Sequence, residues 1–176
     1  MTIKKIAVIG CPGSGKSVLA AKLANKTGLP IVFLDAAYHN ASRWSSDAAE
    51  KRQQWREYVE QLVQNPEWII DGNYKRTLEI RAGAADAIVF LDYRRRICIH
   101  RAVVRAFRWY TGATQAPGGN PGKLGFGFVR FIWTFRKVER PKVIQLLGTF
   151  GDQKMVYILT TPEQAEAFVL DAEFLQ

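Results

Sequence analysis

The sequence predicts an α/β protein in which helices cover both faces of a parallel β-sheet. Short apolar runs alternate five times with segments of helical spacing, as in folds built from strand–helix–strand units with right-handed crossovers. The runs are residues 3–9, 31–34, 68–70, 87–91 and 155–159. A glycine-rich turn, GCPGSGKS at residues 10–17, joins the first run to the first helical segment. With 176 residues, nearly half of them apolar, we expect one domain over residues 1–176 with a sizeable core.

The turn at residues 10–17 fits the pattern G-x-x-x-x-G-K-[ST] in the strand–turn–helix context that this pattern requires. Its glycines let the backbone approach a phosphate closely, and its N–H groups form an anion-binding nest at a helix N-terminus. We expect Lys16 to reach the β- and γ-phosphates of ATP and Ser17 to offer its hydroxyl to Mg²⁺. The residues expected to bind the nucleotide here are Gly10, Cys11, Pro12, Gly13, Ser14, Gly15, Lys16, Ser17 and Val18.

Two aspartates follow apolar runs that are predicted strands. The run at 31–34 ends at Asp35, and residues 36–46 are expected to form a loop. The run at 68–70 ends at Asp71, which is the pattern of a carboxylate that reaches the Mg²⁺ of a nucleotide site, usually through water. Ligands of open α/β sheets bind at the carboxyl ends of the strands. We therefore expect Asp71 near the metal and Asp35 at the acceptor, as an orienting group or base.

Positive charge is concentrated in one segment. The net charge is +9, and residues 93–140 hold eleven Lys and Arg against one acid, Glu139. Helices are expected at about 94–110 and 126–140, joined by a glycine-rich loop at 111–125, with Pro141 interrupting the second helix. We interpret this hairpin, about residues 94–140, as a lid that brings arginines onto the transferring phosphate and excludes water. The candidate contacts are Arg101 and Arg105 for the nucleotide, and Arg136 and Arg140 for catalysis.

A second interpretation of the hairpin remains open. Aromatic residues alternate with its basic residues, and nucleic-acid bases stack on aromatic side chains. Weak, nonspecific nucleic-acid binding would therefore also explain the segment.

Composition excludes several classes of protein. No apolar run approaches the length of a membrane span, so no membrane partner is expected. Cys11 and Cys98 are far apart in the sequence and fit no metal-binding spacing, which favours reduced thiols in a cytoplasmic protein.

The chain resembles the FlaR-like P-loop proteins, also labelled DNA topology modulation proteins, which are related to adenylate kinases. The resemblance covers about residues 3–170. It is carried by the glycine-rich turn, Leu34-Asp35 with Trp44, residues 69–77 (IIDGNYKRT), Phe90-Leu91-Asp92 and residues 133–136 (WTFR) leading into Arg140-Pro141. It implies a P-loop NTPase fold with five parallel strands in the order 2-3-1-4-5. Residues 71–77 are also similar to the Asp-Gly-Phe-Pro-Arg-Thr of adenylate kinases, where the arginine binds the acceptor phosphate. That similarity implies an acceptor-binding role for Arg76, with Arg81 as a second candidate.

From the motifs and the resemblance we expect an ATP-dependent kinase similar to nucleoside-monophosphate and shikimate kinases. It would use Mg²⁺ and transfer the γ-phosphoryl group of ATP to a small-molecule or nucleotide acceptor that carries an anionic group. The alternative is an ATP-dependent, nucleic-acid-associated protein that modulates DNA topology through the basic hairpin.

Overall fold

The computed structural model of the chain describes residues 2–112, 124–151 and 153–172. Within these residues, the strands form one parallel sheet in the order β2-β3-β1-β4-β5. This sheet confirms the predicted α/β fold class and the strand order that the resemblance implies. The strands are β1 (Lys5–Gly10), β2 (Ile31–Phe33), β3 (Trp68–Asp71), β4 (Ala87–Leu91) and β5 (Met155–Leu159).

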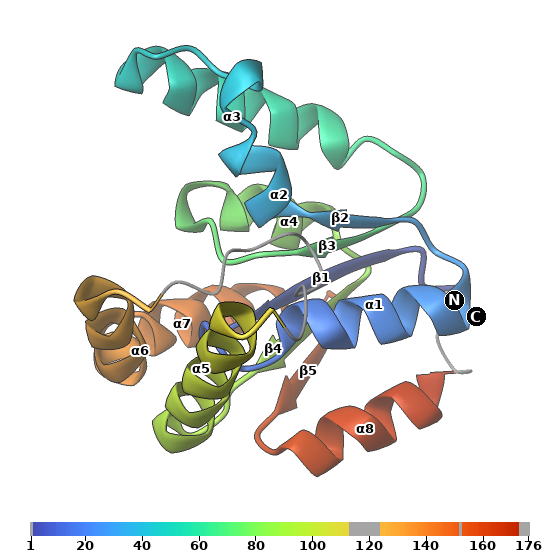
Figure 1. Cartoon of the computed structure of the whole chain (residues 1–176). Helices are drawn as coiled ribbons and strands as arrows, with labels where there is room; N and C mark the ends of the chain where they lie inside the picture. Colours follow the sequence, from blue (N-terminus) through green and yellow to red (C-terminus); the bar gives the residue numbers. More distant parts are fainter. Residues whose placement is uncertain (1, 113–123, 152, 173–176) are drawn as a thin grey trace.

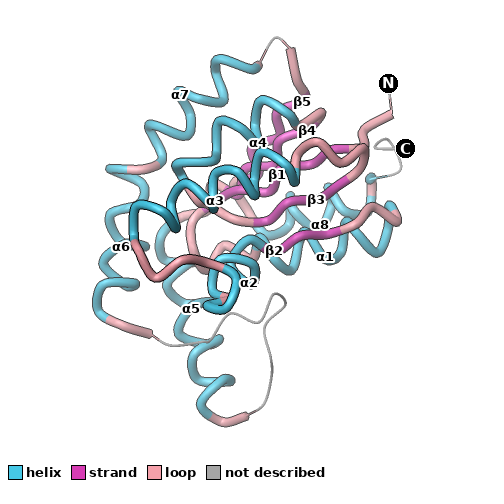
Figure 2. Tube along the Cα trace, turned by 90° about the horizontal axis from the view of Figure 1, so that it is seen from above, coloured by secondary structure: helices cyan, strands magenta, loops and turns pink. Residues whose placement is uncertain are grey.

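The central strands are buried because helices cover both faces of the sheet. α1 (Lys16–Thr27) and α8 (Pro162–Leu170) lie on one face, and α4 (Leu78–Ala84) and α7 (Arg140–Phe150) lie on the other (Figure 2). α3 (Ala48–Leu62) packs against α4. All residues of β3 and β4 are buried, as are those of β1 beyond its first residue. Continuous apolar runs suit strands that are covered on both faces.

Two further helices lie beyond the carboxyl ends of the strands. α5 (Arg95–Tyr110) and α6 (Phe126–Val138) pack against each other there (Figure 1). We call these two helices the basic hairpin. Residues 113–123 of the loop predicted at 111–125 lie outside the described residues. No helix in the described parts of the chain combines the length and apolar character needed to cross a membrane.

The segment after β2 differs from the sequence prediction. The strand ends at Phe33, and the chain turns at once into α2 (Leu34–His39), followed by a 3-10 helix (Ala41–Arg43). Asp35 therefore lies in the first turn of a helix, and the predicted loop over residues 36–46 is wrong for most of its length. A carboxylate is favourable in that first turn because a helix N-terminus carries partial positive charge.

The helical segment around Pro141 consists of two helices. α6 ends at Val138 and α7 begins at Arg140, with Pro141 in the first turn of α7. Proline is tolerated at that position because the first N–H groups of a helix have no partner within the helix. The chain therefore breaks just before the proline, whereas the sequence placed the kink or break at the proline itself.

Candidate functional site

The turn between β1 and α1 adopts a backbone that its glycines permit. Gly13 and Gly15 have φ angles of 81° and 95°, in the left-handed region that favours glycine. A Cβ atom on Gly13 would lie 2.3 Å from the carbonyl oxygen of Cys98. α5 therefore packs directly against the turn, and the backbone of the turn is held between β1 and the basic hairpin.

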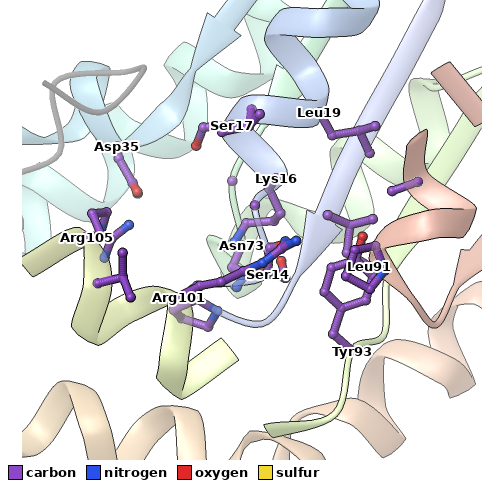
Figure 3. A pocket seen from close by; sticks show the side chains of 18 of the residues that line it. Ser14, Lys16, Ser17, Leu19, Asp35, Asn73, Leu91, Tyr93, Arg101 and Arg105 are labelled. Carbon is purple, nitrogen blue, oxygen red and sulfur yellow. The ribbon is translucent and has the colours of Figure 1, made fainter. Parts of the chain in front are cut away.

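A cavity of about 860 Å³ opens beside this turn, which is within the usual size range of small-molecule and cofactor sites. In Figure 3, Lys16 and Ser17 lie on one side of the cavity, Arg105 of α5 lies on the other side near Asp35, and Arg101 reaches from α5 to Ser14 of the turn. The cavity extends from Tyr93 at one end to Asp35 at the other. It thus runs along the whole row of strand ends where ligands of such sheets bind.

Ser17 and Asp71 are in contact where α1 begins. The Ser17 hydroxyl donates a hydrogen bond of 2.5 Å to Oδ2 of Asp71. The other carboxylate oxygen, Oδ1, is buried and has no hydrogen-bond partner among the described residues. Burial raises the pKa of Asp71, although the nearby Lys16 ammonium and the Ser17 hydrogen bond act to lower it.

These two side chains fit a Mg²⁺ ion that is bound together with nucleotide phosphates. Mg²⁺ takes oxygen ligands and usually keeps several waters while binding one or two carboxylates and the phosphates of its substrate. Among the residues that the structure describes, no three His, Cys, Asp or Glu side chains could hold a metal by themselves. A metal here would therefore depend on phosphate and water, and it would satisfy the unpaired oxygen of Asp71.

The other end of the cavity combines a carboxylate, a phenol and a guanidinium. Asp35 and Arg105 point toward one another there (Figure 3). Tyr74 also lines this end of the cavity, and burial, together with the charge of Asp35 and a hydrogen-bonding interaction with it, raises the pKa of Tyr74. Burial lowers the pKa of Arg105, which the charge of Asp35 opposes. The phenol therefore stays protonated and orients the carboxylate.

Unpaired buried polar atoms gather around this cavity. Among the described residues, the side-chain atoms of this kind are Ser14 Oγ, Trp55 Nε1, Asp71 Oδ1 and Arg105 Nε. Ser14 and Arg105 line the cavity, and Asp71 binds Ser17, which also lines it. Because buried polar groups in native proteins are nearly always paired, their accumulation here indicates a polar ligand.

The structure brings many of the predicted site residues to the cavity. Residues 12–18 line it, as do Asp35, Arg101 and Arg105. Arg101 donates a hydrogen bond of 2.9 Å to the carbonyl oxygen of Ser14, which fixes its guanidinium against the turn. Gly10 and Cys11 do not line the cavity, because they lie where the turn leaves the sheet.

Four predicted arginines lie away from this cavity. Arg76 is exposed on a 3-10 helix (Lys75–Thr77) and is not among the lining residues. Arg140 binds both carboxylate oxygens of Asp92, at 2.9 and 2.8 Å. Arg136 lines a separate hollow on the hairpin. Arg81 is buried and donates to the carbonyl oxygen of Gly72 at 2.9 Å, and burial lowers the pKa of Arg81 to about 10.

Asn73 is a site residue to which the sequence interpretation gave no role. Its Oδ1 accepts a hydrogen bond of 3.1 Å from the N–H of Gly10, and its Nδ2 donates one of 2.5 Å to the Gly10 carbonyl. The side chain thus pairs with the backbone at the start of the glycine-rich turn and also lines the cavity. The sequence did contain a signal for Asn73. Its amide comes directly after Gly72, which follows a buried apolar strand at the edge of the sheet where ligands bind.

The two cysteines, far apart in the sequence, are neighbours in the fold. Both are buried free thiols, and the hydrogen bond with Cys98, together with burial, raises the pKa of Cys11. The Cys11 side chain is therefore a neutral packing group. Its carbonyl oxygen accepts a hydrogen bond of 3.2 Å from the Lys16 ammonium.

No protein-family model and no curated protein matches the chain. Solved structures share its fold. Shikimate kinase from Bacteroides thetaiotaomicron is 18% identical, with a TM-score of 0.59 over 99% of both chains. Shikimate kinase from Acinetobacter baumannii, in complex with shikimate, is 12% identical, with a TM-score of 0.66 over 99% of this chain and 93% of that one. A gluconokinase from Sinorhizobium meliloti 1021 is 18% identical, with a TM-score of 0.51 over 98% and 95%.

At these identities the similarity establishes the fold alone, which the chain shares with two shikimate kinases and a gluconokinase. The resemblance to FlaR-like proteins and the role in DNA topology stay predictions from the sequence.

Proposed function

We propose that the chain is an ATP-dependent phosphotransferase that moves the γ-phosphoryl group of ATP to a hydroxyl of a small-molecule acceptor. The observation that carries the proposal is the single cavity that joins Lys16 and Ser17 to Asp35 at its far end. A protein that only bound nucleotide would need the first part of this cavity and not the second. The names of the structural neighbours, shikimate kinase and gluconokinase, support a small hydroxy acid as the acceptor.

The nucleotide half of the cavity supplies positive charge and backbone N–H donors. The N–H groups of the turn at residues 10–17 receive the phosphates, and Lys16 and Arg101 neutralise their charge. Ser17 and Asp71 would hold Mg²⁺, which neutralises charge on the β- and γ-phosphate oxygens when bound.

The acceptor half supplies a base and a cation for the transfer. As the acceptor oxygen forms its bond to the γ-phosphorus, its proton passes to Asp35, and the bond between that phosphorus and the β–γ bridging oxygen breaks to release ADP. Tyr74 orients Asp35 through its hydrogen bond. Arg105, which faces Asp35, stabilises negative charge on the phosphoryl group in transit.

An anionic group on the acceptor would be held by cavity residues other than Arg76. Arg108 follows Arg105 by one helical turn on α5, and His39 follows Asp35 by one turn on α2, so both lie at the acceptor end. Both line the cavity, whereas Arg76 does not. We assign the recognition of a carboxylate or phosphate to Arg108 with His39.

Coupled release of ADP, measured with a panel of hydroxy acids, sugars, nucleosides and nucleoside monophosphates, tests the proposal. With the acceptor found, Asp35→Asn should lower kcat by about a hundredfold or more, because general base catalysis contributes roughly 10²–10⁴-fold. The KM for ATP should change little. Arg76→Ala is the matched control, since it removes an exposed charge nearby, and it should retain kcat.

Lys16→Ala should lose ATP affinity in calorimetric titration while remaining folded, because it leaves phosphate charge without its counter-charge. Undiminished ATP affinity in this variant would disprove the nucleotide site. ATP binding with no acceptor that stimulates ADP release above slow hydrolysis would disprove phosphotransfer.

A further inference from the structure

The basic hairpin carries a second hollow that, among the described residues, shares no lining residue with the cavity beside the glycine-rich turn. It has a volume of about 350 Å³. Five cationic side chains and one indole line it: Arg94, Arg95, Arg96, Trp133, Arg136 and Lys137. We call it the basic hollow. On α6, Trp133 and Lys137 project from the face opposite to Phe128 and Phe131, which line the nucleotide cavity. The cationic side chains of the hairpin are therefore divided between two separate hollows.

The charge of the basic hollow is not balanced within the described structure. Its five cationic side chains form no ion pair or hydrogen bond with any described residue, and the guanidinium of Arg95 lies over the ring of Trp133. By contrast, Arg101 and Arg140 of the same region are both paired. Three of the five cations stand at the start of α5, whose first turn holds no acidic residue. Cations at a helix N-terminus are unfavourable, so the local potential is strongly positive and attracts an anion.

Trp133 adds a flat apolar surface to this charge. Its side chain is 53% exposed although it is one of the largest apolar groups in the chain. The guanidinium carbon of Arg95 lies 4.1 Å from the centre of its ring. An exposed indole and a guanidinium, side by side among further cations, are the groups on which unpaired nucleic-acid bases stack while phosphates bind nearby.

We propose that the basic hollow binds single-stranded nucleic acid, with phosphates on its cations and a base stacked on Trp133. A duplex would satisfy the cations but could not offer an unpaired base to the indole. Binding to a membrane surface would require apolar side chains that extend beyond the charged groups into the lipid. Trp133 instead lies among the cationic side chains in a concavity. The proposal does not rest on the proposed phosphotransfer, because the two sites have no residue in common.

Fluorescence anisotropy of a labelled oligo(dT) of about 15 nucleotides, titrated from about 50 to about 300 mM NaCl, tests the proposal. Binding should weaken with salt, with a log–log slope of up to about −3.5, from about 0.7 per cation for single strands. The double variant Arg96→Gln/Arg136→Gln should bind more weakly and reduce the slope by about 1.4. Trp133→Leu should weaken binding about tenfold and leave the slope unchanged.

The matched control is Arg52→Gln/Arg56→Gln, which removes the same charge from α3 and should behave as the unmodified chain. Saturating Mg·ATP should not displace the oligonucleotide. Displacement by Mg·ATP, with full binding retained in the hollow variants, would place the strand in the nucleotide cavity and overturn the proposal. No binding at the lowest salt, a control as impaired as the hollow variants, or duplex binding that Trp133→Leu leaves intact would each overturn it. Sedimentation of the protein with phosphatidylserine vesicles, without binding to the oligonucleotide, would also overturn the proposal.

Discussion

At the scale of single residues, Asp71 connects ligand binding with stability. It is 5% exposed, and one of its oxygens has no hydrogen-bond partner among the described residues. Burial raises its pKa, so the folded chain holds this proton more tightly than the unfolded chain does. Stability must therefore fall as the pH rises from the unfolded value of about 3.9 through the raised pKa.

We expect Asp71→Asn to raise the free energy of unfolding at pH 7 by about 1 kcal/mol, the lower end of the cost of a buried unpaired polar group. The advantage should vanish below about pH 4, where the wild-type carboxyl is protonated in both states. Urea unfolding of both proteins between these pH values measures the difference. A variant that is less stable than the wild type at pH 7 would show that Lys16 compensates the buried charge in full.

Residues fixed by a local motif could be predicted from the sequence, whereas side-chain directions could not. Lys16 and Ser17 depend on the backbone of one turn, which the glycine spacing determines. The arginines of the hairpin depend on helix phase, and one residue rotates a side chain by about 100°. Arg101 and Arg105 face the cavity, while Arg136 faces the basic hollow. Asn73 was missed because its partner, the Gly10 backbone, lies on a different strand.

At the scale of elements, the contact between α5 and the glycine-rich turn at residues 10–17 depends on the absence of a side chain at Gly13. Both Gly13 and Gly28 have positive φ, but only Gly13 has backbone atoms where a Cβ would lie. Gly28→Ala should therefore cost only the left-handed backbone penalty of about 1–2 kcal/mol and keep ATP affinity. Gly13→Ala should cost about 1–3 kcal/mol more, through overpacking, and lose ATP affinity as α5 moves from the turn.

Chemical denaturation and ATP titration of the two variants, side by side, measure these effects. If the Gly13→Ala and Gly28→Ala variants have equal stability and equal ATP affinity, α5 shifts without cost and its packing does not fix the conformation of the turn.

Elements with strong patterns were predicted well, and short elements at functional positions were not. The strands β1, β3 and β4 follow from apolar runs long enough to be covered on both faces. α2 has only six residues, too few for a helical repeat to be visible, and it begins directly after β2. Tertiary packing rather than local pattern places it, since Leu34 is fully buried and lies against Gly72.

At the scale of the whole molecule, two ion pairs at the junction of α6 and α7 connect the basic hairpin to residues that follow strands of the sheet. Arg140 binds the buried carboxylate of Asp92 after β4, and the adjacent Glu139 binds Lys75 after β3 at 2.5 Å. Arg140→Leu should destabilise the fold by about 3 kcal/mol, because Asp92 would keep a buried charge without a partner.

The exposed pair Arg56–Glu60 on α3 provides the control, and Arg56→Leu should cost less than about 0.5 kcal/mol. Asp92→Asn in the Arg140→Leu background should recover part of the loss, because it removes the orphaned charge. Thermal or urea unfolding of these three variants and of the wild type measures the differences. If Arg140→Leu costs no more than Arg56→Leu, the pair does not fasten the hairpin.

The position of β1 has a consequence for how the protein is made. β1 comes first along the chain but stands in the middle of the sheet, where Ile6 lies beside Ile69 on one side and Ala87 on the other. During synthesis the apolar side chains of β1 stay uncovered until its two neighbours in the sheet, β3 and β4, leave the ribosome much later. Such long-range pairing closes large loops and slows folding, and it leaves the waiting strand open to aggregation. The turn proposed to bind ATP is therefore translated well before β4, yet it gains a rigid support only after β4 has emerged.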